Sequence, residues 1–72
     1  MSDSLPILLE NSIQIAWDYL ERTGEIDDGA VASQFLAGTI EHMIRSGERR
    51  RLILSNRAIT AYQRFRREPK VA

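Results

Sequence analysis

The stretch that decides the fold is "IQIAWDYLERTGEIDDGAVASQFL", residues 13 to 36, in which one helical pattern stops and a second begins. Gly24 suits the position just after a helix, where the backbone turns left-handed without a side-chain penalty. Asp27 and Asp28 suit the N-cap that follows, because a short carboxylate accepts hydrogen bonds from the free amides of a helix start. The stretch therefore predicts two helices joined by a short turn.

The first helix is predicted over residues 6–23, with Ser4 and Pro6 suited to its start. Apolar residues recur along it at helical spacing in two adjoining strips, which together cover about half of the circumference. One neighbouring helix does not cover a face that wide. The strips consist of Leu9, Ile13, Ala16, Trp17 and Leu20, and of Leu8, Ile15 and Tyr19.

The second helix is predicted over residues 28–46, where "SG" at Ser46 and Gly47 ends the pattern. The third is predicted over residues 55–68, with Ser55 as its N-cap and Pro69 closing it. Only "RRLILS", residues 50–55, has an extended character. The apolar stripe of the second helix is Val31, Phe35, Leu36, Ile40, Met43 and Ile44, and that of the third is Ala58, Tyr62 and Phe65 with Ile59 at its edge.

These patterns predict one all-α, three-helix domain over residues 1–72, with residues 1–4 and 69–72 frayed. A chain of this size has a marginal core, and it contains no cysteine for a disulfide. We therefore expect a homodimeric helical bundle, of which one form exchanges the third helix between subunits. The alternative is a monomeric three-helix bundle that encloses all of its apolar surface. The candidate dimer-core residues are Leu8, Ile15, Tyr19, Phe35, Leu36 and Ile40.

Charge is divided along the chain although the formal net charge is zero. Residues 1–41 hold eight acids and one base, which gives −7, and residues 42–72 hold nine bases and two acids, which gives +7. Nine of the ten bases are arginine. Such asymmetry indicates either contact with nucleic acid or mutual attraction of the two halves, within one chain or between two.

Arginine suits both interpretations, because a guanidinium pairs bidentately with carboxylates and with phosphates. We favour pairing with acidic protein surface, because the sequence pI of about 6.6 does not indicate a basic protein. Nucleic-acid binding is the alternative. Arg66, on the side of Ile59, is predicted to extend along apolar surface instead. The candidate patch for protein or phosphate contact is Arg49, Arg50, Arg51, Arg57, Arg64 and Arg67.

Two DNA-binding arrangements fit the expected elements poorly. A helix-turn-helix joins its helices with three or four residues, whereas residues 47–54 form an eight-residue joint. A ribbon-helix-helix needs two helices after its strand, and only one follows "RRLILS".

The residues for catalysis are sparse, so we do not expect an enzyme. His42 is the only imidazole, and Ser12 and Ser33 lie in helices without a nucleophile elbow. "GEIDDG" gives no frame for a twelve-residue calcium loop, and no glycine-rich phosphate loop is present. We expect no cofactor, no metal, no membrane span and a cytoplasmic location. The sequence predicts an interaction module that serves as adaptor, scaffold or regulator.

Overall fold

The computed structural model describes residues 4–67 and consists of three helices, with no strand among those residues. They are α1 (Leu5–Arg22), α2 (Gly29–Arg45) and α3 (Arg51–Arg67). The predicted all-α, three-helix fold is confirmed.

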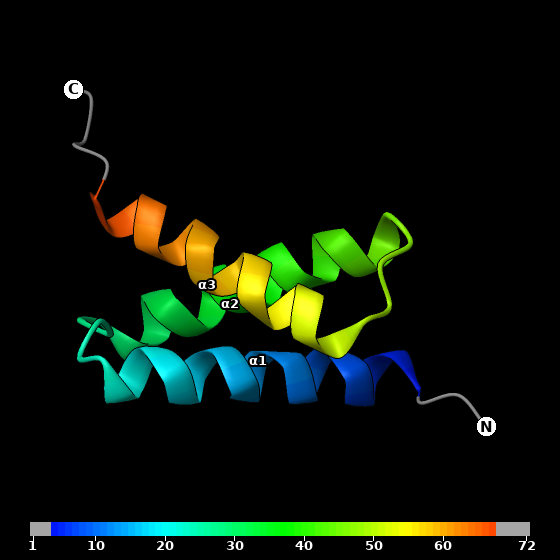
Figure 1. Cartoon of the computed structure of the whole chain (residues 1–72), viewed down its shortest axis with the longest axis horizontal. Coiled ribbons are helices and arrows are strands. Elements are labelled where there is room, and N and C mark those ends of the chain that lie inside the picture. Colours follow the sequence, from blue (N-terminus) through cyan, green and yellow to red (C-terminus); the bar gives the residue numbers. More distant parts are fainter. Residues whose placement is uncertain (1–3, 68–72) are drawn as a thin grey trace.

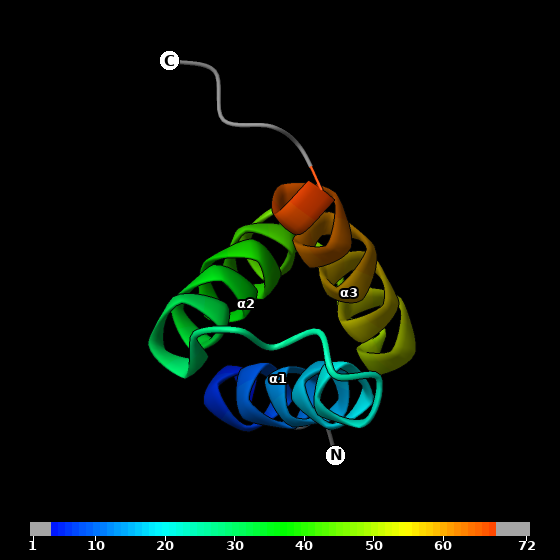
Figure 2. The same cartoon turned by 90° about the vertical axis from the view of Figure 1, so that its left-hand side faces the viewer.

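Each helix packs against both others. The three form a triangle when viewed end-on (Figure 2). α2 runs back over α1, and α3 then runs in the same direction as α1 (Figure 1). The α1–α2 loop therefore lies at the same end of the bundle as the last turns of α3.

The ends of α1 and α2 follow the sequence signals. Ser4 is the N-cap of α1 and Asp28 that of α2, where its carboxylate accepts from the amides of Ala30 and Val31 at 3.0 and 3.3 Å. Gly24 and Gly47 follow the helix ends with φ of 73° and 109°, the left-handed region that glycine enters without strain. The predicted fraying of residues 1–4 and 69–72 lies outside the described residues, apart from Ser4.

The predicted start of the third helix is wrong, because α3 begins at Arg51 and takes in the whole apolar run before Ser55. Ser55 is not an N-cap. It is buried within the helix, and its hydroxyl donates back to the carbonyl oxygens of Arg51 and Leu52, both at 3.1 Å. The end of the helix, predicted at residue 68, lies outside the described residues. The connection from α2 has five residues, 46–50, so the eight-residue spacing used against a helix-turn-helix is also wrong.

The core is built from one four-residue stripe on each helix, and small side chains make up much of it. Five of its twelve buried residues are alanine or serine, which lets the helix backbones approach closely. Of the strip predicted on the first helix, Ala16 and Leu20 are buried, whereas Leu9, Ile13 and Trp17 flank the core. The stripes are Leu8, Ser12, Ala16 and Leu20; Ala32, Leu36, Ile40 and Ile44; and Leu54, Ser55, Ala58 and Tyr62.

Three aromatic rings join α2 to α3 beside this core. Phe35 stacks on Phe65 with ring centroids 4.8 Å apart, and it meets Tyr62 edge-on at 5.7 Å. Phe65 stays half exposed. This contact identifies the side of α3 that faces α2.

The two buried serines give a test of the core. The Ser12 hydroxyl is fully buried and has no hydrogen-bond partner among residues 4–67, whereas that of Ser55 has two. We expect Ser12→Ala to raise the free energy of unfolding by about 1 kcal/mol more than Ser55→Ala, because an unsatisfied buried hydroxyl destabilises the fold. Both replacements gain the same helix propensity, so their difference isolates the hydroxyl. Urea denaturation followed by circular dichroism measures it, and equal effects would contradict the assignment.

Candidate functional site

The predicted arginine patch begins in the connection between α2 and α3, where its members bind the chain itself. Arg49 donates from its guanidinium to the carbonyl oxygens of Ile44 and Glu48, close to the carboxyl end of α2. Arg50 donates to both carboxylate oxygens of Glu48, at 3.0 and 3.3 Å. The first arginines of the run thus hold the corner between two helices.

Glu48 organises this corner. Its carboxylate also accepts from the backbone amides of Arg49 and Arg50, at 3.2 and 3.0 Å, immediately before α3 begins. The hydrogen bond from the Arg50 side chain, followed by that from the Arg50 amide, lowers the pKa of Glu48 from 4.5 to about 2. The same contact raises the pKa of Arg50.

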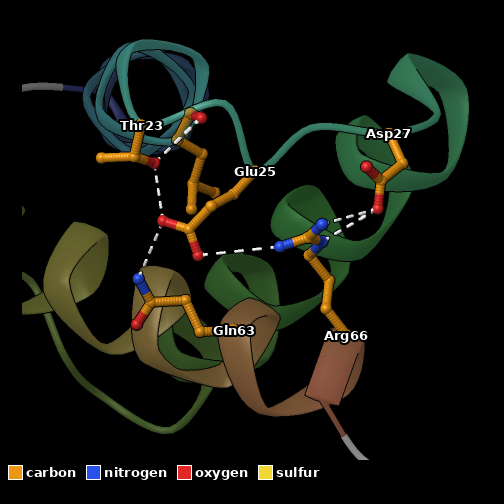
Figure 3. Close-up of polar contacts among 6 residues, drawn as sticks. Thr23, Glu25, Asp27, Gln63 and Arg66 are labelled. Atoms are coloured by element: carbon orange, nitrogen blue, oxygen red, sulfur yellow. Dashed lines mark hydrogen bonds and ion pairs between the residues drawn. The ribbon is translucent and has the colours of Figure 1, made fainter.

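A second polar network ties the α1–α2 loop to the last turns of α3 (Figure 3). Arg66 donates to one oxygen of Asp27 from two nitrogens, at 2.8 and 3.0 Å, and lies 3.9 Å from Glu25. Glu25 also accepts from Thr23 at 2.6 Å and from Gln63 at 3.1 Å. Hydrogen bonds from Thr23 and then Gln63 are the main causes that lower the pKa of Glu25. The Asp27 contact raises the pKa of Arg66.

This network joins the acidic and basic halves of the sequence within one chain. It uses Arg66, which we had placed along apolar surface. Its partners are Asp27, 39 residues earlier in the sequence, and Glu25 in the same loop. Charge counting indicates that such pairs form, but it does not identify the arginine, because the pairing depends on where the loop lies against α3.

The remaining patch residues divide between two places on α3. Arg57 and Arg64 line a shallow hollow on its outer face, and neither forms an ion pair with any residue of the described part of the chain. Arg67 instead lines a hollow with Glu25 and Arg66. Arg51 is exposed in the first turn of α3. The six arginines therefore do not make one surface, and the outer-face hollow is completed by Asn56, Thr60 and Ala61.

The candidate dimer-core residues also lie in different environments. Leu8, Leu36 and Ile40 lie in the chain's own core. Phe35 is half-buried within the aromatic contact, and Ile15 is half-buried on α1. Tyr19 is 46% exposed.

Ile15 and Tyr19 belong to the side of α1 that faces α3. Trp17 lies toward α2, because a Cβ atom on Gly29 would be 3.5 Å from its ring. Ile15 and Tyr19 lie on the opposite side of the buried stripe, at 100° per residue.

On α3, Phe65 marks the side that meets α2. Leu52 and Ile59 lie across the buried stripe from it, at 100° per residue, on the side that faces α1. Leu52 is 68% exposed and Ile59 is half-buried. These side chains form a strip along the groove between the two helices, which we call the α1–α3 seam: Ile15, Tyr19, Leu52 and Ile59. Leu52 was missed from sequence because we expected it in a joint.

Within residues 4–67, no group of three or more histidine or carboxylate side chains is placed to hold a metal ion. None of the three described helices has both the length and the apolar character needed to cross a bilayer. Comparison of the chain with protein-family models, curated proteins and solved structures finds no match.

Glu48 gives a pH-dependent test of the corner. Since its pKa is lower in the folded chain than its ordinary 4.5, the ionised carboxylate stabilises the fold above pH 4.5, and that stabilisation is lost as the pH falls toward 2. We expect Glu48→Gln to lower the thermal midpoint near pH 7, with a gap to the original protein that narrows below pH 4.5. Glu41→Gln is the control, because Glu41 is exposed and its one ion pair with a residue in the range 4–67 is with Arg45, one turn away. A gap that stays constant from pH 7 to 2, or one no larger than that of Glu41→Gln, would contradict this role.

Proposed function

We propose that this protein is a non-catalytic helical interaction module that acts as a homodimer through its α1–α3 seam. The observation that carries the proposal is the exposure of Leu52 and Tyr19, at 68% and 46%, beside the half-buried Ile15 and Ile59. An apolar strip in a groove between two helices gains free energy when a partner removes it from water.

A second copy is the partner that the charges favour. The exposed charged residues of α1 are acidic apart from Arg22, while those of α3 are all arginine within the described range. A two-fold axis across the seam brings α1 of each copy against α3 of the other, so the charges attract twice. The acidic residues of α1 are Glu10, Asp18 and Glu21, and the arginines of α3 outside its outer-face hollow are Arg51, Arg66 and Arg67.

The composition of the core supports association. With alanine and serine at five of twelve buried positions, the chain encloses little apolar volume for its 72 residues. Burial of the seam in a dimer adds to the apolar surface that is removed from water. The proposed dimer pairs two complete three-helix chains, because α3 already packs on α1 and α2 of its own chain.

Two features support a role without catalysis. The hydroxyl of Ser12 is enclosed in the core, where a substrate does not reach it. His42, the only imidazole, lies on the exposed face of α2. Both have the environment of structural or surface residues.

The proposal is tested by the mass in solution. At tens of micromolar, light scattering is expected to give twice the 8.2 kDa mass of the chain. Leu52→Glu should shift the protein toward 8.2 kDa and weaken dimerisation at least about tenfold, because it places a carboxylate in the buried seam.

The matched control is Val31→Glu. Val31 is 42% exposed in the first turn of α2, as Leu52 is exposed in that of α3, but it lies on the side of α2 that carries Phe35, away from the seam. A glutamate in either first turn is compatible with the helix dipole, so neither change should unfold the chain. A folded original protein of 8.2 kDa, or equal dissociation by both variants, would refute the seam as the dimer interface.

A further inference from the structure

The outer face of α3 carries a group of polar side chains that neither the core nor the seam uses. Arg57 and Arg64 lie on one face at a spacing of seven residues, about 10 Å along the axis. Between them lie Thr60 and Ala61, with Asn56 at the edge, around a shallow hollow open to solvent. The face thus offers two guanidinium groups, an amide and a hydroxyl.

This face is separate from the seam. At 100° per residue, Arg57 and Arg64 lie about 140° around α3 from Leu52 and Ile59. They lie about 80–100° around α3 from Phe65, which marks the side that packs on α2. Figure 2 shows α3 as the right-hand side of the triangle, with its outer side turned away from the other two helices. A dimer formed across the seam leaves this face accessible.

Three acids beside α3 are already held by other arginines. Glu48 is held by Arg50 before the helix begins, and Asp27 and Glu25 are held by Arg66. Within residues 51–67 α3 itself contains no carboxylate. The charge of Arg57 and Arg64 is therefore not neutralised by any ion pair with residues 4–67.

We propose that the outer face of α3 binds the phosphate backbone of double-stranded DNA. Arginine forks bind phosphate oxygens bidentately, and asparagine and threonine donate to phosphates or to base edges. A spacing of about 10 Å spans about three phosphates along one strand. A helix of about 10–12 Å diameter fits the major groove of B-DNA, about 12 Å wide, whereas the major groove of double-stranded RNA is too narrow for it.

Arginine by itself suits carboxylates and phosphates equally. The other side chains of the outer face favour phosphate over an acidic protein surface. A protein partner would be expected to meet apolar side chains, and the lining of this hollow includes only one, Ala61.

The test measures binding of a fluorescent 20-base-pair DNA duplex of mixed sequence by anisotropy, at about 50 and 200 mM salt. The probes for comparison are a 20-base-pair RNA duplex and polyglutamate of equal charge. We expect micromolar binding of DNA that weakens with salt, and weaker binding of both comparison probes. Binding of polyglutamate as tightly as DNA would assign the face to acidic protein instead, and absence of DNA binding at the lower salt would overturn the proposal.

The variant Arg57→Gln/Arg64→Gln locates the site. Loss of two phosphate contacts should reduce the slope of log affinity against log salt by about two. The fourfold rise in salt should then weaken the original protein about twelvefold more than the variant. Circular dichroism should show the variant folded, since both side chains are exposed.

The control variant is Arg22→Gln/Arg45→Gln. It changes the net charge equally, but at α1 and α2. Its salt slope should match that of the original protein. Equal reduction by the two double variants would show that net charge alone attracts DNA, and it would reject the outer face of α3 as the site.

Discussion

The fold depends on the close approach of three helices over small side chains. Ala16, Ala32 and Ala58 are fully buried, one from each helix, and Ser12 and Ser55 extend the contact. Close packing of backbones gains dispersion energy across the whole interface. Leu20, Leu36, Ile40 and Leu54 are also fully buried, so large aliphatic side chains share the core with the small ones.

The apolar surface of the molecule is a consequence of that constraint. Where alanine and serine let the helices approach closely, longer side chains just outside the buried stripes lie in the grooves between helices. Trp17 covers the groove toward α2, and Ile15 with Ile59 partly fills that toward α3. Leu52 and Tyr19 are left at the outside of this groove. The exposed apolar strip thus follows from the geometry of the core and needs no distortion of any helix.

The sequence predicts the parts of this structure that depend on local chemistry. Helix ends at Gly24, Asp28 and Gly47 lie where their capping preferences indicate, because a cap is decided within four residues. The start of α3 was predicted wrongly because a serine hydroxyl can either cap a helix or donate back within one. Burial of Leu54 and Ser55 decides between these two roles. The buried stripe of the first helix was predicted without Ser12, because a periodicity of apolar residues does not detect a buried serine. The partner of Arg66 depends on how a loop lies against a helix 39 residues later, and no local pattern contains it.

The network around Arg66 also bears on how long the folded state lasts. Its bonds from Gln63 to Glu25 and from Arg66 to Asp27 span 38 and 39 residues, so they form only after both helical corners have brought the ends of the bundle together. The entropy of closing such a loop rises only slowly with length, by about 0.6 kcal/mol for each doubling. Contacts completed after the rate-limiting step of folding act mainly on the rate of unfolding. We therefore expect the contacts of Gln63 and Arg66 to slow the release of α3 from α1 and α2, with little influence on how fast the three helices first assemble.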